Sequence, residues 1–222
     1  MSADELLADT LAAHGGLACW QAVDRITADF SSWGPAFSLH GQPDTLRGLR
    51  LTLHPHAREL ILHDFGGPGQ QGLWSPDRVR ITDAAGTLLH ERVRPRASFE
   101  RLDRLVRWDA LDILYFAGYA LWNYLGFPFL LTLPGVTGLS ARPTADGGTR
   151  LCAHFDAGFP THSREQTFHL DAACHLLRHD YTADVIGRWA RAANYALAPV
   201  TVGGLRCYAR RRVLPRLAGS VL

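Results

Sequence analysis

The chain has 222 residues, 47% of them hydrophobic, which is typical of one globular domain spanning residues 1–222. Its formal net charge of +2 is too small to indicate the basic surface of a nucleic-acid-binding protein, so we expect no nucleic-acid partner. All 23 basic residues are arginine, which excludes a Schiff-base lysine, a pyridoxal phosphate anchor and a P-loop lysine, and we expect no cofactor.

The N-terminal segment predicts a helix rather than a signal peptide. Ser2 and Glu5 have the spacing of a capping box, leucines follow on one face, and Gly15 is positioned to end the helix. The first residues are acidic and lack the basic and apolar regions of a secretory signal. The four cysteines lie far apart without a Cys-x-x-Cys pair, so we expect free thiols and a cytoplasmic location.

Alternating apolar and polar residues then predict an antiparallel meander. The expected strands are residues 25–33, 36–40, 48–54, 58–65, 78–82 and 87–93. The segments between them are too short for parallel crossovers. Residues 67–72 satisfy the G-x-G-x-x-G pattern, but no helix follows that could hold a pyrophosphate, so we interpret them as a turn.

A charged linker over residues 94–107 leads into an apolar helix expected at 108–127. Residues 113–141 carry no charge, yet Asn123 and two prolines interrupt the run, so we expect a buried helix and no stable membrane span. One helix face offers aromatic rings and polar tips, which predicts a wall for an apolar ligand; an ordinary core face is the alternative. The predicted wall residues are Tyr115, Tyr119, Trp122 and Asn123.

Strands are expected to resume at residues 136–141 and 150–156, and a hairpin is expected from 160–170 and 176–183. Residues 185–196 fit a helix or a strand, and 205–214 fit a closing strand. This order predicts an α+β fold in which a long curled antiparallel sheet is wrapped around an apolar central helix.

The hairpin carries the most informative side chains. A turn at residues 171–174 would pair Leu170 with His175 and set Gln166 opposite His179. On that register one face carries His162, Arg164, Gln166, Phe168, Leu177, His179 and Tyr181.

Buried imidazole, phenol and guanidinium groups on one face can perform acid-base chemistry or orient the polar end of a ligand. We assign His162 as general acid or base, Tyr181 as proton donor and Arg164 as the anchor for a carboxylate or enolate. Gln166, Phe168 and His179 are expected to contact the ligand. Structural histidines and a core tyrosine are the alternative reading of the same pattern.

A histidine group earlier in the chain could be drawn as a metal site. His54, His56 and His63 have the right side-chain chemistry, but Pro55 lies at an apparent turn and no spacing typical of a zinc site is present. We therefore expect no metal.

Several short strings carry a family resemblance: His14-Gly15-Gly16, then Pro-Thr-His-Ser-Arg-Glu-Gln-Thr-Phe at 160–168, Asp-Tyr-Thr-Ala-Asp at 180–184 and Arg-Arg-Arg at 210–212. In these strings and in the order of its elements, the chain resembles the bacterial lipoprotein-carrier (LolA/LolB-like) half-barrel group. The resemblance implies a half β-barrel whose concave side holds a hydrophobic molecule. A similar half-barrel serves a cofactor-independent enzyme of the violacein pathway, so the fold can host catalysis.

These observations predict a cofactor-independent enzyme of specialised metabolism that isomerises, cyclises or hydrates a small hydrophobic substrate. The alternative is a non-catalytic carrier for a lipid or another hydrophobic ligand. In both cases the expected partner is a small hydrophobic molecule. The sequence defines neither that molecule nor the oligomeric state.

Overall fold

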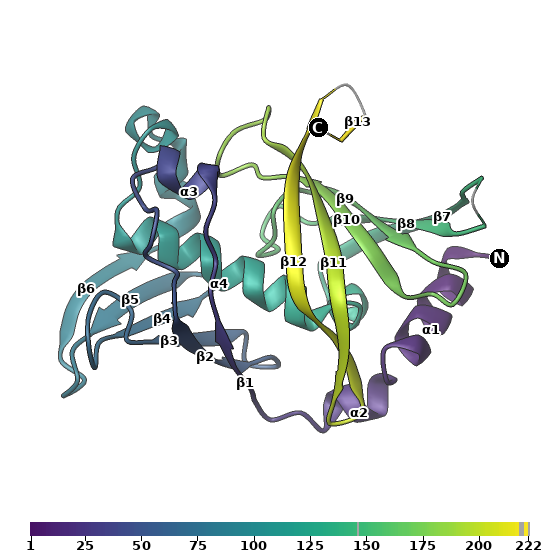
Figure 1. Cartoon of the computed structure of the whole chain (residues 1–222), viewed down its shortest axis with the longest axis horizontal. Coiled ribbons are helices and arrows are strands. Elements are labelled where there is room, and N and C mark those ends of the chain that lie inside the picture. Colours follow the sequence, from purple (N-terminus) through teal and green to yellow (C-terminus); the bar gives the residue numbers. More distant parts are fainter. Residues whose placement is uncertain (146, 218–219, 222) are drawn as a thin grey trace. The chain divides into compact units, whose positions relative to one another are not determined.

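Antiparallel strands dominate the computed structural model (Figure 1), which describes residues 1–145, 147–217 and 220–221. Within these residues one sheet has six strands and the other has seven. The first sheet belongs to a unit spanning Val23–Tyr124, and the second belongs to a unit made of Met1–Ala22 and Leu125–Leu222. The predicted α+β class and the antiparallel pairing are confirmed.

The six-stranded sheet is a meander in which each strand pairs with the next along the chain. Its strands are β1 (Ile26–Phe30), β2 (Leu49–His54), β3 (Glu59–His63), β4 (Gln71–Ser75), β5 (Arg78–Thr82) and β6 (Leu88–Val93). Buried and exposed residues alternate along β2 and β5, because successive side chains point to opposite faces. The predicted meander is therefore confirmed, with two local corrections.

The first correction concerns residues 36–40, which do not form a strand. They belong to helix α3 (Pro35–Leu39), which begins after Gly34. Proline is favoured at the first helical position because its fixed φ suits the helix and its missing N–H would have had no partner there.

The second correction is a strand that the sequence pattern did not indicate. Gln70 N–H donates to Gly67 O, so the predicted turn exists, but Gln71 already begins β4. Gly72 lies inside β4 where a Cβ would come within 2.8 Å of the side chains of Phe65 and Leu114. A glycine within a strand thus marks a close approach of neighbouring groups rather than a turn.

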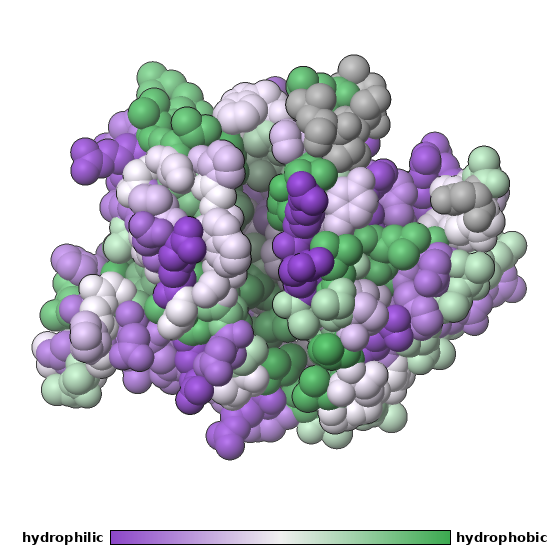
Figure 2. All heavy atoms as spheres, viewed as in Figure 1, coloured by the Kyte–Doolittle hydropathy of each residue, from purple (hydrophilic) through white to green (hydrophobic). Residues whose placement is uncertain are grey.

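The charged linker over residues 94–107 also carries exposed apolar side chains. It forms two 3-10 helices, η1 (Pro95–Glu100) and η2 (Leu102–Leu105). Leu102 and Val106 are 82% and 71% exposed, and Leu39 of α3 is 72% exposed. Figure 2 shows hydrophobic atoms gathered over this part of the unit.

Helix α4 (Ala110–Gly126) confirms the predicted apolar helix. Its start is set by Asp109, whose carboxylate accepts the N–H groups of Leu111 and Asp112, each at 3.0 Å. Among the described residues, no helix combines the length and the apolar character needed to cross a bilayer.

We expect Gly118→Ala to destabilise the protein by about 2 to 3 kcal/mol, because a new Cβ would overpack the core. That Cβ would lie 2.1 Å from Cγ of Trp74, whose ring packs directly on this glycine. Chemical denaturation would measure the change. Gly126→Ala, in the same helix, is the control, since its Cβ would meet nothing closer than 3.7 Å. A loss for Gly118→Ala no larger than for the control would contradict the prediction.

The second unit contains helix α1 (Ala3–Ala13), helix α2 (Leu17–Gln21), the 3-10 helix η3 (Phe129–Thr132) and the seven-stranded sheet. The predicted capping box at Ser2 and Glu5 is present. The strands of the sheet are β7 (Val136–Pro143), β8 (Thr149–Phe155), β9 (Glu165–Leu170), β10 (Leu176–Thr182), β11 (Arg191–Val202), β12 (Leu205–Leu217) and β13 (Ser220–Val221). Each pairs with its neighbours in chain order.

Residues 185–196, which fit both a helix and a strand, are divided at Arg191. The residues before it form turns, and those from Arg191 onward join β11. The two faces of the sheet differ across strands β8 to β11. The buried face carries Leu151, Phe168, His179 and Asn194, whereas the open face carries more accessible side chains such as Cys152 and Thr167.

Candidate functional site

The hairpin of β9 and β10 has a different register from the predicted one. Phe168, not Gln166, lies opposite His179, and Leu170 lies opposite Leu176 rather than His175. The turn is one residue longer than expected because the Asp171 carboxylate accepts the N–H of His175 at 2.8 Å.

A bulge between Leu176 and Arg178 adds a second one-residue shift. The two shifts together preserve the alternation, so His179 and Tyr181 still share a face with Gln166 and Phe168. Leu177 is the exception: it lies in the bulge, is 47% exposed and is not on the predicted buried face.

Five of the predicted residues come together on the buried face and form what we call the histidine cluster. Its members are His162, Gln166, Phe168, His179 and Tyr181, all nearly inaccessible to solvent. The His162 and Tyr181 rings stack with centroids 3.8 Å apart, and the Phe168 and His179 rings stack at 4.3 Å. His179 and Tyr181 are 4.8 Å apart. The cluster therefore consists of two stacked ring pairs, each with one imidazole, joined by a tilted contact between His179 and Tyr181.

Hydrogen bonds to Gln166 determine the tautomer of His179. The Gln166 amide nitrogen donates to Thr161 Oγ1 at 2.6 Å and to Ser163 O at 2.8 Å. Its Oε1 therefore accepts from His179 Nε2, 2.6 Å away, which must carry the proton. The lone pair of the neutral imidazole is then on Nδ1.

The surroundings of His179 also keep it uncharged. Burial lowers the pKa of His179 well below its ordinary value, and the charges of His162 and Arg211 lower it further. A neutral imidazole with one assigned N–H is able to accept a proton at its other nitrogen. The site thus contains a base whose protonation state does not change near neutral pH.

Asn194 is a candidate site residue that the sequence pattern did not reveal. It lies directly opposite His179 on β11 and is fully buried. Within the described part of the chain, neither its amide nitrogen nor its amide oxygen has a hydrogen-bond partner. Buried polar groups are nearly always paired, so this amide is available to a molecule with a complementary donor and acceptor. The only sequence signal was a polar residue inside an ambiguous segment.

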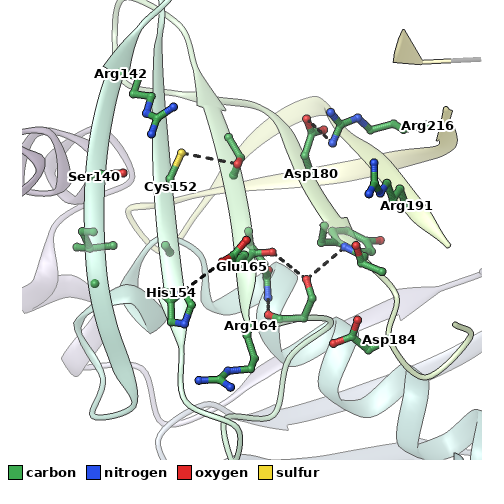
Figure 3. Close-up of a pocket in the computed structure, with 18 residues that line it drawn as sticks. Ser140, Arg142, Cys152, His154, Arg164, Glu165, Asp180, Asp184, Arg191 and Arg216 are labelled. Atoms are coloured by element: carbon green, nitrogen blue, oxygen red, sulfur yellow. Dashed lines mark hydrogen bonds and ion pairs between the residues drawn. The ribbon is translucent and has the colours of Figure 1, made fainter. Parts of the chain in front are cut away.

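Arg164 does not join the histidine cluster, contrary to the prediction. It precedes β9 and its side chain is exposed. Its backbone carbonyl accepts the N–H of Phe155, which holds the main chain in place while the guanidinium reaches solvent. Figure 3 shows that guanidinium pointing away from Asp180. A charged group without a buried acidic partner is more stable in water, which accounts for the difference.

The predicted wall residues belong to α4 in the other unit. Tyr115, Tyr119, Trp122 and Asn123 are all buried. Trp122 Nε1 donates to Pro55 O at 3.1 Å, and Asn123 Nδ2 donates to Tyr119 O at 2.7 Å. The aromatic face therefore exists, and its role as a ligand wall stays a prediction.

The histidines considered as metal ligands do not form one group. His63 lies opposite Arg50 and His54 lies opposite Glu59, at the two ends of the β2–β3 ladder. The His63 Nε2 atom is 2.9 Å from Thr52 Oγ1. In the part of the chain that the structure describes, no three histidine, cysteine, aspartate or glutamate side chains cluster as metal ligands would.

The open face of the same sheet contains a hollow of about 850 Å³ that the sequence analysis did not predict. Figure 3 shows Arg142 on one side of it, Arg191 and Arg216 on the other, and Asp180 of β10 beside Arg216. Gln166 and Tyr181 also contribute to its lining. Because the ring of Tyr181 stacks in the histidine cluster, only the edge or backbone of this residue is available to the hollow.

Comparison with known proteins does not assign a family. A scan against protein-family models finds no match, and a search of curated proteins finds no significant relative. The resemblance to the lipoprotein carriers stays a prediction.

Proposed function

We propose that the protein is a cofactor-independent enzyme that performs acid-base chemistry on a small hydrophobic substrate at the histidine cluster. The observation that carries this proposal is the pairing of a neutral His179, with its tautomer set by Gln166, and an Asn194 amide that lacks a partner among the described residues. A base and a polar recognition group lie on adjacent strands of one buried face.

The chemistry that these groups support best is proton transfer within one substrate molecule. In the proposed step, an imidazole of the cluster, from His162 or His179, removes a proton from a carbon next to a carbonyl group, and the carbonyl oxygen takes up the negative charge. The Asn194 N–H and the Tyr181 hydroxyl stabilise that oxygen. Return of the proton to another carbon gives an isomer, so no oxidant, reductant or cofactor is consumed.

The remaining residues position these groups. His162 stacks on Tyr181 and remains a second acid or base in the proposal, while Phe168 packs against the other ring of the cluster. Arg164 has no part in it because its side chain is exposed. The resemblance to half-barrel carriers supports a hydrophobic substrate, since the concave side of such a barrel holds an apolar molecule.

A carrier would use the same residues only to orient its ligand. To separate the two functions, the purified protein is incubated with an extract of its native host, and bound and free small molecules are followed by untargeted mass spectrometry. An enzyme consumes a compound and releases one of the same mass in catalytic amounts. A compound retained unchanged in stoichiometric amount identifies a carrier.

We expect Tyr181→Phe and His179→Gln to lower turnover by about 100-fold or more, since acid-base groups typically contribute that much. Tyr181→Phe retains the aromatic ring that stacks on His162, so it tests the hydroxyl alone. His154→Gln, on the open face and 43% exposed, is the matched control. Turnover by both variants at the rate of the control would refute the catalytic assignment, provided that circular dichroism shows them folded.

A further inference from the structure

We propose that the open face of the seven-stranded sheet binds the oxyanion group of a small organic acid or phosphate ester between Arg191 and Arg216. This site lies on the face opposite the histidine cluster and is independent of the proposed function. Its hollow of about 850 Å³ has the size typical of small-molecule sites.

The two arginines face each other across neighbouring strands. β11 and β12 pair with Ala192 opposite Pro215, so the next position in the same register sets Arg191 opposite Arg216. Both residues line the hollow. Like charges directly opposite each other in a sheet are destabilising, and an anion between them would remove that repulsion.

Among the described residues, only one of the two guanidinium groups has an acidic partner. Arg216 Nη1 lies 3.1 Å from Asp180 Oδ2, whereas the Arg191 guanidinium makes no ion pair or hydrogen bond with any described residue. Arg216 Nε is buried and also lacks a hydrogen-bond partner in the described part of the chain. The planar, forked N–H donors of a guanidinium group match the oxygens of a carboxylate or a phosphate.

Asp180 does not cancel the positive charge, because it already serves three partners. Arg178 Nε lies 2.9 Å from Asp180 Oδ1, and His169 Nε2 lies 2.8 Å from Oδ2, in addition to Arg216. Burial acts to raise the pKa of Asp180, but the hydrogen bonds and charges of His169 and Arg178 outweigh it and lower the pKa below its ordinary value. The Asp180 carboxylate is therefore ionised and holds Arg216 in place. Because it is shared with Arg178 and His169, it does not neutralise the full positive charge around it.

Other groups define how a ligand would lie. Thr182 is opposite Arg191 on β10, so its hydroxyl stands in the same row as the two guanidinium groups. The hollow also holds Glu165 and Asp184, which confines anion binding to the end where the arginines converge. Arg142 lines the hollow from β7, where it can contact a second polar group of the same ligand (Figure 3).

The site is tested by calorimetry, which measures the binding of inorganic phosphate and of citrate to the full chain. Chloride at equal ionic strength is the reference anion. We expect at least one of the two oxyanions to bind, and its dissociation constant to rise about tenfold or more in Arg191→Gln. Binding of phosphate alone identifies a phosphate site, and binding of citrate alone identifies a carboxylate site. Arg210→Gln is the matched control, since Arg210 is an exposed arginine of β12 outside the hollow.

The melting temperature in low salt without added oxyanion gives a second readout. Arg191→Gln should melt at the same temperature as the wild type or higher, because it removes repulsion and no partner. Equal oxyanion affinity in Arg191→Gln and Arg210→Gln, no oxyanion binding, or equal binding of chloride would overturn the proposal. A lower melting temperature for Arg191→Gln alone would also do so, since it would reveal a structural role.

Discussion

Replacing Asp112 with alanine is expected to destabilise the protein by about 3 to 5 kcal/mol, the usual consequence of removing one partner from a buried ion pair. Asp112 is fully buried in the first turn of α4. Its carboxylate lies 2.6 Å from Arg92 Nη1 and 3.2 Å from Arg104 Nε. It also accepts hydrogen bonds from Ser98 Oγ and from the Asp109 N–H. All of these groups lose a partner in the variant.

Asp109 is a second carboxylate that contacts the same two arginines as Asp112. Its carboxylate also contacts Arg92 and Arg104, at 2.7 and 3.0 Å, so the arginines keep one acidic partner when Asp112 is lost. Burial raises the pKa of Asp112, whereas hydrogen bonds and the nearby guanidinium charges outweigh burial at Asp109 and lower its pKa to about 2. Of the two carboxylates, Asp112 is therefore the one whose ionised form is less stable in its surroundings and depends more on these ion pairs and hydrogen bonds.

Urea unfolding followed by circular dichroism would measure the change. Asp103→Ala is the matched control in the neighbouring segment, because its ion pair with Arg101 is exposed and solvent screening leaves such a pair little effect on stability. If Asp112→Ala lost no more stability than Asp103→Ala, the buried contacts of Asp112 with Arg92 and Arg104 would not be important for the stability of this unit.

Acid is expected to destabilise the native state through His14, by up to about 3 kcal/mol. Burial lowers the pKa of His14 from 6.5 to about 4, although its hydrogen bond to Thr10 acts in the opposite direction. Nδ1 donates to Thr10 O at 2.8 Å, so Nε2 is unprotonated and accepts from the Tyr208 hydroxyl at 3.2 Å. Protonating Nε2 would leave a buried charge facing that hydroxyl.

The sign follows from proton binding. Between pH 6.5 and about 4 the unfolded chain binds a proton at His14 that the folded chain does not. The stability due to neutral His14 is therefore fully present above pH 6.5 and is lost as the pH falls toward 4. His179, whose pKa is also lowered by burial, acts in the same direction.

Unfolding free energies measured across this pH range would check the prediction. His14→Gln should flatten the curve, because glutamine can still hydrogen-bond but gains no proton. His90→Gln, at an exposed position of β6, controls for the loss of an imidazole. A curve for His14→Gln as steep as that of the wild type would show that other groups cause the acid sensitivity.

Properties that depend on neighbouring residues could be predicted from the sequence. The capping box at Ser2, the apolar helix before Gly126 and the alternation of β9 and β10 all depend on short-range spacing. The prediction for residues 36–40 failed because a short apolar run fits either element, and Pro35 there begins a helix.

Strand alternation predicted the members of the histidine cluster correctly but failed for Arg164. The cluster members were predicted because strand alternation assigns each residue to a face, and a register error of two residues preserves that assignment. Arg164 was assigned to the same face by alternation, yet it lies before the strand begins, where alternation no longer applies.

The sequence by itself determined the α+β class, the antiparallel order and the buried aromatic and imidazole side chains. Only the tertiary structure decided which residues of different strands meet. Asn194 opposite His179, and Arg191 opposite Arg216, follow from the pairing of β10, β11 and β12. Hydrogen bonding between strands and packing against the core set that pairing, and neither depends on the spacing of residues within one segment.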